Sequence, residues 1–296
     1  MNPGFIDHLS AAIRDATRCP FTLRNFLPIG GGSISETYRL EGTDGSRYFL
    51  KVNDIQHLPM FVAEAVGLDA IAGTKSIRVP NAIAHGTAGM QSYQLLEYLE
   101  LRSHGNAKRL GEQIAALHRC TAPHFGFPQD SFIGTTPQPN DRADDWVAFW
   151  REQRLGFQLR LAAQNGCSGQ LRRLGERLID ALPIFFAGYT PQPSLLHGDL
   201  WSGNHAFLVD STPAIFDPAT YYGDRECDIA MTELFGGYAA DFYTAYRAAY
   251  PLDEGYAIRR DVYNLYQVLN HTNLFGASYA RQAEQLMQKL LAQGGR

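Results

Sequence analysis

Cysteine is scarce in this sequence, and no pattern joins the few that are present. Only four occur among 296 residues, Cys19, Cys120, Cys167 and Cys227, and no two of them form a C-x-x-C pair or stand near clustered histidines. Disulfide frameworks and zinc sites depend on such spacings, so neither is expected here. We therefore expect reduced thiols in a cytoplasmic protein.

Long apolar runs and an excess of positive charge are missing as well. No stretch approaches the ~18 apolar residues that a membrane span needs, and residues 1–10 lack the basic start of a secretory signal. The formal net charge is -4, which argues against nucleic acid as the main partner. These absences predict a protein whose partner is neither a membrane nor a nucleic acid, and they do not predict an oligomeric state.

The first hundred residues predict a small β-rich domain. Residues 5–17 and 58–72 place apolar side chains at helical spacing, while runs rich in β-forming residues are separated by glycines and turn residues. The predicted strands span 22–29, 36–40, 47–52, 82–85 and 93–99. They predict a five-stranded antiparallel sheet with one inserted helix.

From about residue 101 the pattern becomes helical, with one β-rich exception at 194–216. The expected helices span 106–119, 144–165, 169–187, 225–234, 239–250 and 255–293, the last with a break at Gly276. A small β-domain before a larger helical domain is typical of protein kinases, although fold alone does not establish function. We expect an α+β, two-lobed protein-kinase-like fold, with residues 1–98 as the nucleotide-binding lobe and residues 99–296 as the catalytic and substrate-binding lobe.

The strongest chemical signal is the segment 195–204, which reads LLHGDLWSGN. Two leucines end a predicted strand, and Asn204 stands five positions after Asp199 in the polar loop that follows. Phosphoryl transfer to an alcohol uses a carboxylate to accept the hydroxyl proton and an oxygen ligand to hold Mg²⁺. Asp199 and Asn204 fit these roles in the order of the kinase catalytic loop. An ordinary Asx-rich turn after a strand is the alternative, and the full string disfavours it.

A second carboxylate, Asp217, directly follows the apolar run 214–216, thirteen residues after Asn204. Mg²⁺ prefers oxygen ligands and keeps several waters, so one Asp, one Asn and phosphate oxygens suffice to hold it. Asp217 corresponds to the aspartate of the kinase D-F-G motif, with Pro218 in place of the phenylalanine. A simple turn formed by Asp-Pro is the alternative.

Lys51 ends an apolar strand, where an ammonium group is costly unless its charge is used. In kinases such a lysine binds the α- and β-phosphates and pairs with a glutamate on a helix. Glu64, on the predicted helix 58–72, is the natural partner. An edge-strand lysine that prevents aggregation is the alternative, but the catalytic loop downstream favours the kinase interpretation.

Two backbone segments complete the predicted nucleotide site. The glycine-rich segment 30–35 lets backbone amides approach phosphates closely. Residues 94–100 are expected to join the lobes, and the backbone at 97–99 is expected to bind the adenine edge, although a plain fifth strand also explains this segment. The residues expected to bind the nucleotide are Gly31, Gly32, Ser33, Lys51, Glu64, Glu97, Tyr98 and Leu99.

Two further residues are expected to support the catalytic loop rather than to touch the substrate. Asp228 stands near the start of the predicted helix 225–234, where it can accept hydrogen bonds from the loop. His197 is interpreted as a packed, hydrogen-bonded loop residue and not as an acid or base.

These residues resemble those of the fructosamine/ketosamine 3-kinase family over nearly the whole chain. The most specific strings are HGDLWSGN at 197–204 and DPATYYGDRE at 217–226. Further matches are Met60-Phe61 with Glu64-Ala65, Leu110-Gly111 through Leu117-His118, and Trp146 with Phe149. Aminoglycoside phosphotransferases and choline-type kinases share the His-Gly-Asp loop, but they usually carry His-Pro where this chain has Trp201-Ser202.

The resemblance implies a kinase that uses ATP and Mg²⁺ to phosphorylate the 3-hydroxyl of ketosamines, the fructosamine and ribulosamine adducts of small-molecule or protein amines. The product is unstable and releases the amine, so the activity amounts to deglycation. The implied roles are Asp199 as base, Asn204 and Asp217 as Mg²⁺ ligands, Lys51 as phosphate clamp, and Trp201 as a surface for the sugar or its amine.

Two other functions remain open at this point. A kinase of another small alcohol, such as an aminoglycoside or choline, is the first. A polycationic aminoglycoside needs a carboxylate-rich pocket, and the C-terminal region offers only Asp253, Glu254, Asp261 and Glu284, scattered among arginines. The second is a pseudokinase, but all five kinase positions are filled. Many relatives carry a cysteine where this chain has Ser33, so redox control through that position is in doubt.

Overall fold

The computed structural model describes residues 3–30, 34–167 and 169–294. The chain forms two compact units, one of residues 1–106 with 206–217 and the other of residues 107–205 with 218–296. We call them the first and the second unit. The lobe boundary between residues 98 and 99 stays a prediction.

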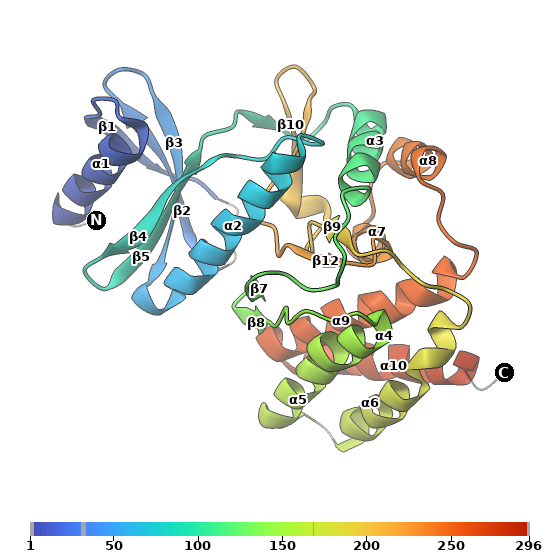
Figure 1. The fold of residues 1–296 in the computed structure, drawn as a ribbon. Helices are drawn as coiled ribbons and strands as arrows, with labels where there is room; N and C mark the ends of the chain where they lie inside the picture. The colour runs from blue at the N-terminus through green and yellow to red at the C-terminus, as the bar shows by residue number, and fades with distance from the viewer. Residues whose placement is uncertain (1–2, 31–33, 168, 295–296) are drawn as a thin grey trace. The chain divides into compact units, whose positions relative to one another are not determined.

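The first unit is built on a five-stranded antiparallel sheet in the order β1-β2-β3-β5-β4 (Figure 1). Its elements are α1 (Pro3–Thr17), β1 (Leu23–Pro28), β2 (Glu36–Gly42), β3 (Arg47–Asp54), η1 (Ile55–His57), α2 (Leu58–Thr74), β4 (Ala82–Ala88), β5 (Gln91–Glu97) and β6 (Leu101–Arg102). The prediction of a five-stranded antiparallel sheet with an inserted helix is confirmed.

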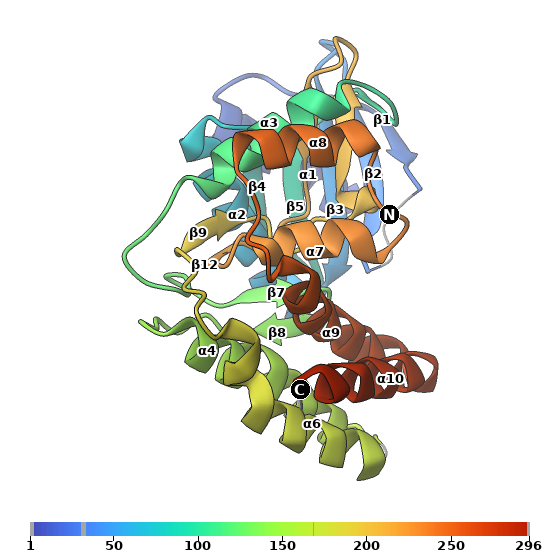
Figure 2. The same cartoon turned by 90° about the vertical axis from the view of Figure 1, so that its right-hand side faces the viewer.

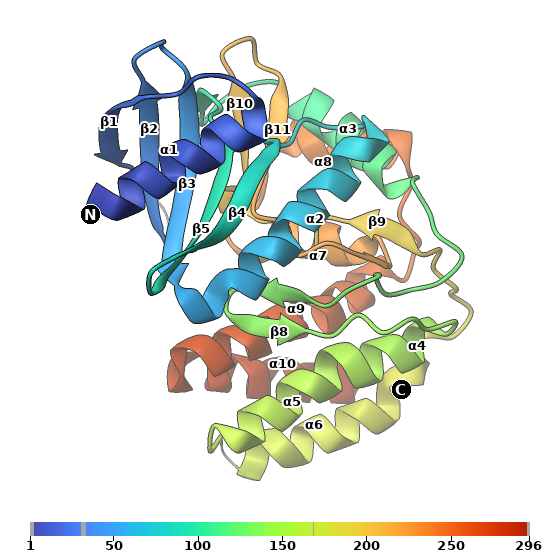
Figure 3. The same ribbon diagram turned by 60° about the vertical axis from the view of Figure 1, so that its left-hand side comes forward.

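The alternation of side chains along β3 separates a packed face from a polar position. Leu50 and Val52 are buried in a cluster with Leu9 and Ile13 of α1, which lies along the sheet (Figure 3). Because successive strand residues point to opposite faces, Lys51 faces away from that cluster. Its side chain instead contacts Glu64 of α2, because the alternation along the strand turns it toward that helix.

The segment 206–217 joins the first unit through backbone pairing. Strand β10 (His205–Leu208) pairs antiparallel with β6, and β11 (Pro213–Ile215) pairs with β10. Ala214 also forms a parallel bridge with Arg78. These pairings bring the residues just before Asp217 into the unit that contains Lys51.

The second unit is mainly helical. Its elements are α3 (Ala107–His118), β7 (Ser131–Ile133), β8 (Thr136–Gln138), α4 (Trp146–Phe149), η2 (Trp150–Leu155), α5 (Gly156–Gln164), α6 (Gly169–Ala181), η3 (Leu182–Phe186), β9 (Ser194–Leu196), η4 (Ser202–Asn204), β12 (Tyr221–Gly223), α7 (Glu226–Leu234), α8 (Ala240–Ala249), α9 (Tyr256–Phe275) and α10 (Ala277–Gly294). Helix α9 is buried along most of its length and contacts α7 and α10, while α8 contacts α3 (Figure 2). No helix among the described residues is long and apolar enough to cross a bilayer.

Two details of the second unit differ from the prediction. The helix expected over 144–165 contains a π-helical segment, η2, between α4 and α5. The expectation of a single β-rich exception in this half was wrong, because β7 and β8 form a separate hairpin. Strands of three residues are too short to show a period. The break expected at Gly276 is confirmed, since this glycine has a φ of 86° between α9 and α10.

Candidate active site

In the first unit, Lys51 is held by two carboxylates. Its Nζ donates to both oxygens of Glu64 at 2.7 Å and to Oδ1 of Asp217 at 2.7 Å. The side chains of Lys51 and Glu64 are only 9% and 10% exposed, whereas that of Asp217 is 46% exposed. The lysine therefore joins a buried partner to one that is open to solvent.

Burial and ion pairing shift the pKa values of Lys51 and Glu64 in opposite directions. Burial would lower the pKa of Lys51, but the carboxylates of Asp217 and Glu64 outweigh it and raise the pKa, so the ammonium form persists. Burial raises the pKa of Glu64 to about 7, although the charge of Lys51 opposes that rise.

Asp217 occupies an unusual backbone conformation. It follows β11 and has a φ of 58°, in the left-handed region that residues with a Cβ rarely adopt. Such conformations persist where the surroundings hold them, and they are common at functional sites. The turn aims the carboxylate at Lys51.

In the second unit, Asp199 and Asn204 are brought together in the loop 197–204, which follows β9 and is called the catalytic loop after the role predicted for it. Nδ2 of Asn204 donates to the backbone oxygen of Asp199 at 2.9 Å and to its Oδ2 at 3.0 Å. Asn204 is buried, so this contact fixes its amide. With the nitrogen turned to Asp199, the oxygen of the amide is the group suited to a cation.

Asp228 anchors the backbone of this loop. Its Oδ2 accepts from the N–H of His197 at 2.7 Å, and its Oδ1 accepts from the N–H of Gly198 at 2.9 Å. His197 is fully buried, and its Nδ1 accepts from the N–H of Asp199 at 3.2 Å. Burial disfavours the ionised form, but hydrogen bonds from His118 and Gly198 lower the pKa of Asp228 below its usual value. A charged, buried carboxylate thus holds the loop.

Sequence reasoning missed the partner behind Asp228. His118, at the end of α3, contacts Oδ2 of Asp228 through Nε2 at 3.1 Å and the hydroxyl of Tyr246 through Nδ1 at 2.8 Å. The dipeptide Leu117-His118 had been noted only as a family match. A histidine on the apolar face of a helix was the available signal, but its partner lies 110 positions away.

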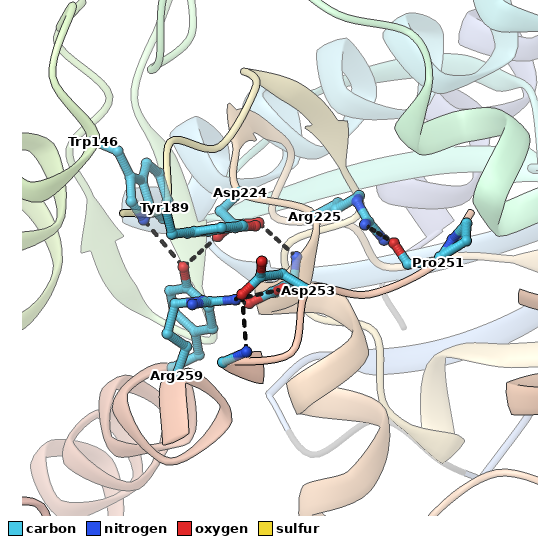
Figure 4. A network of polar contacts seen from close by, with 10 residues as sticks. Trp146, Tyr189, Asp224, Arg225, Pro251, Asp253 and Arg259 are labelled. Carbon is cyan, nitrogen blue, oxygen red and sulfur yellow. Dashed lines mark hydrogen bonds and ion pairs between the residues drawn. The ribbon is translucent and has the colours of Figure 1, made fainter. Parts of the chain in front are cut away.

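The run 221–226 also contributes a polar network that the sequence did not reveal (Figure 4). Asp224 accepts a hydrogen bond from the hydroxyl of Tyr189 at 3.1 Å. Arg259 of α9 donates to Glu226 at 2.8 and 3.1 Å and to Asp253 at 2.6 Å. These contacts tie the start of α7, the helix that carries Asp228, to α9.

Trp201, two positions after Asp199, lies within the catalytic loop and at the surface. It is 37% exposed, and its carbonyl accepts from the hydroxyl of Tyr238 at 3.0 Å. Its ring is 6.4 Å from that of Phe235 in an edge-on arrangement. The indole is therefore supported on one side and accessible to a ligand.

The expected adenine segment lies at the end of β5. The N–H of Glu97 donates to the carbonyl of Asn81 at 2.9 Å, and its side chain pairs with Arg78. That N–H is thus engaged, so an adenine contact here depends on the other backbone groups of residues 97–99. The predicted phosphate-binding residues Gly31, Gly32 and Ser33 lie outside the described residues.

The available donors suit a magnesium ion. Over the described ranges, no group of three or more His, Cys, Asp or Glu side chains is arranged to hold a metal. Asp217 offers a partly exposed carboxylate in the first unit, and Asn204 offers an amide oxygen in the second. Oxygen ligands of this kind, few in number, match the way Mg²⁺ is held together with phosphate oxygens.

Comparison with known proteins agrees with this chemistry. The chain is 44% identical over 292 residues to a probable ketoamine kinase of Synechocystis, covering 96% of each protein. It is 40% identical over 269 residues to a chloroplastic protein-ribulosamine 3-kinase of Arabidopsis thaliana, covering 89% of this chain and 81% of that protein.

Solved structures share the fold. The structure of a candidate fructosamine-3-kinase from Haemophilus somnus matches with a TM-score of 0.87 and 30% identity, covering 96% of each chain. A macrolide 2'-phosphotransferase from Brachybacterium faecium matches with a TM-score of 0.57 at 17% identity over 96% of this chain and 98% of that one, which shows the two-lobed kinase-like fold alone. The family model for fructosamine kinase matches residues 5–293. This chain therefore belongs to the fructosamine kinase family.

Proposed function

We propose that this chain transfers the γ-phosphoryl group of Mg·ATP to the 3-hydroxyl of ketosamines and so starts their removal from amines. Membership of the family makes the chain a ketosamine kinase. The observation that carries the assignment of its catalytic centre is the contact of Asn204 with Asp199, in a loop whose backbone is bound by Asp228.

Within this proposal, Asp199 is the base. Its carboxylate orients the 3-hydroxyl and accepts its proton as the phosphoryl group is transferred. A positioned base contributes about 10²–10⁴-fold, and positioning with charge neutralisation supplies much of the rest. Asn204 holds the carboxylate in place through its amide nitrogen.

Lys51 clamps the α- and β-phosphates, and Glu64 keeps its ammonium group in position. Asn204 and Asp217 would hold Mg²⁺, which, when bound, neutralises charge on the phosphates. The backbone groups of residues 97–99 other than the engaged N–H of Glu97 would bind adenine, and Gly31, Gly32 and Ser33 are the residues proposed to bind the phosphates. A serine at position 33 leaves no thiol there for redox control.

Trp201 forms the surface for the sugar–amine. Its exposed ring, next to the loop that carries Asp199, can meet a protonated amine, and such a contact contributes on the order of 0.5–2 kcal/mol. The substrate is a free or protein-bound ketosamine. We place the reaction in the cytoplasm, where ATP is abundant.

The test is an ADP-release assay with Mg·ATP against ribuloselysine, fructoselysine, kanamycin and choline. We expect turnover with the ketosamines alone, and Asp199→Asn should lower kcat by about 10²–10⁴-fold while ATP affinity stays nearly intact. The variant keeps the size of the side chain but cannot accept the proton. Near-normal turnover in Asp199→Asn would remove it as base, and turnover with kanamycin or choline alone would replace the substrate class.

A further inference from the structure

The hairpin formed by β7 and β8 has no part in the reaction as described so far. Its last residue, Gln138, is completely buried, and both ends of its amide are bonded. Nε2 donates to Oγ of Ser131 at 2.7 Å and to the backbone oxygen of Ala219 at 3.0 Å. Oε1 accepts the hydroxyl of Tyr266 at 2.7 Å. Through Ala219, which binds the carbonyl of His197, Gln138 is connected to the catalytic loop.

Ala219 is held from two sides. Its N–H donates to the carbonyl of His197 at 2.8 Å, while Gln138 binds its own carbonyl. Gly198 packs so closely that a Cβ there would lie 2.1 Å from the Ala219 oxygen. A change in the direction of this carbonyl would therefore disturb the catalytic loop as well.

Ala219 is also two residues after Asp217 in the chain. Asp217 has a φ of 58°, a left-handed conformation that Asp adopts more readily than most residues with a Cβ but that is still less favourable than a right-handed or extended one. Pro218, between them, has a φ fixed by its ring. The Pro218 ring and the bond from the Ala219 N–H to His197 thus restrict, without removing, the backbone torsions between Ala219 and Asp217.

Arg154 binds the two residues that directly follow the β7–β8 hairpin. Its guanidinium donates to the carbonyl of Pro139 at 2.6 Å and to Oδ1 of Asn140 at 2.7 Å, and it lies 4.0 Å from the ring centroid of Tyr221. This cation is fully buried, yet no carboxylate within the described part of the chain forms an ion pair with it. A buried charge without a counter-charge is costly. The hydrogen bonds of Arg154 to residues 139 and 140 hold the chain directly after Gln138.

We propose that Gln138 is a positioning residue for phosphoryl transfer, whose amide holds the Ala219 carbonyl and thereby orients Asp217 toward Mg·ATP. The inference rests on the proposed function only through the role of Asp217 and not through the choice of acceptor. Removing a group that orients a metal ligand typically lowers metal affinity or activity about 10–100-fold.

Gln138→Glu is the sharpest test, because it keeps the size and the acceptor for Tyr266 but replaces the donor that faces Ala219. By calorimetry without acceptor, we expect its affinity for Mg·ATP to fall about 10–100-fold. In the assay, kcat should fall while the KM for the ketosamine stays at the wild-type value. A carboxyl group donates only when protonated, so the deficit of Gln138→Glu should shrink as the pH falls toward the pKa of the introduced carboxyl.

Tyr266→Phe is the matched control. It removes one buried hydrogen bond from the same amide but leaves the bond to Ala219, so we expect a lower free energy of unfolding with unchanged Mg·ATP affinity. Gln138→Met, apolar and of similar size, is the second variant, and it should show the affinity loss without the pH dependence.

Wild-type Mg·ATP affinity in either folded Gln138 variant overturns the proposal, and so does an equal loss in Tyr266→Phe. If the wild-type protein phosphorylates no ketosamine while the Mg·ATP affinities follow the expected pattern, the acceptor is wrong and the role of Gln138 stands.

Discussion

At the scale of single residues, His118 sits in a hydrogen-bond chain with one direction. An ionised Asp228 can only accept, so Nε2 of His118 must carry the proton between them. In the neutral imidazole, Nδ1 then accepts from the hydroxyl of Tyr246, whose oxygen accepts from Arg225 at 3.0 Å. The chain ends at the backbone of the catalytic loop, so a change at His118 acts on Asp199 from a distance.

His118→Leu should therefore destabilise the protein and slow the reaction. It leaves Asp228 and the Tyr246 hydroxyl each short of a buried partner, which costs about 1–3 kcal/mol for each such group. Urea unfolding measures the loss. His118→Gln, which can present an amide N–H to Asp228, should recover part of the stability and of kcat. Equal unfolding midpoints for His118→Leu and the wild type would show that the chain has no structural effect.

The residues proposed to be catalytic were visible in the sequence because the proposed chemistry depends on short, specific strings. Asp199 and Asn204 lie five positions apart, and Glu64 lies thirteen after Lys51, so local spacing suggested each pairing. Gln138 and Arg154 gave no such signal. A buried glutamine or arginine looks the same in sequence as an exposed one, and its burial follows from packing.

At the scale of elements, α7 and α9 are joined by a buried ion pair. The side chains of Glu226 and Arg259 are 0% and 3% exposed, and the guanidinium also lies 3.6 Å from the ring centroid of Tyr189. The pair therefore holds α7 against α9 (Figure 4). Because α7 also carries Asp228, which binds the backbone of the catalytic loop, the pair supports that loop indirectly.

Removing one partner of this ion pair should destabilise the folded protein strongly. Arg259→Met leaves Glu226 and Asp224 buried without the guanidinium and should lower the free energy of unfolding by about 3–5 kcal/mol. The double change Arg259→Met with Glu226→Leu should cost less, because no uncompensated carboxylate remains at position 226. Arg172→Met is the control, since its contact with Glu176 is exposed and contributes about 0–1 kcal/mol. A loss as small as that of the control would contradict the argument.

Elements were predicted well where they are long and periodic. The helices α1 and α2, the five strands of the first unit and the break at Gly276 were all expected. The β7–β8 hairpin and the π-helical segment were not, because three-residue strands carry no measurable period and a π turn differs from an α turn by a single added residue.

At the scale of the whole molecule, a half-buried histidine, His271, links stability to pH. Burial lowers the pKa of His271 below 6.5, although its hydrogen bond with the carbonyl of Gln267, at 2.8 Å, opposes the shift. Below pH 6.5 the unfolded chain therefore binds this proton more readily than the folded chain. The contribution of neutral His271 is complete above that value and is lost as the pH falls.

His271→Asn keeps a neutral side chain at every pH and should remove this contribution. Urea unfolding at several pH values between about 7.5 and about 5 should show a smaller loss of stability on acidification than in the wild type. His85→Asn, at an exposed position, is the control and should keep the wild-type slope. Parallel slopes for His271→Asn and the wild type would show that this histidine is not protonated on unfolding.

The sequence by itself determined the periodic elements, the two-lobed kinase-like fold class and the strings from which the reaction was inferred, because each depends on residues close together in the chain. Only the tertiary structure decided which distant groups meet. Lys51 and Asp217 are 166 positions apart, His118 and Asp228 are 110 apart, and Gln138 and Ala219 are 81 apart. Such contacts arise when packed elements bring polar groups out of water, where each must find a partner, and no local pattern records which partner that is.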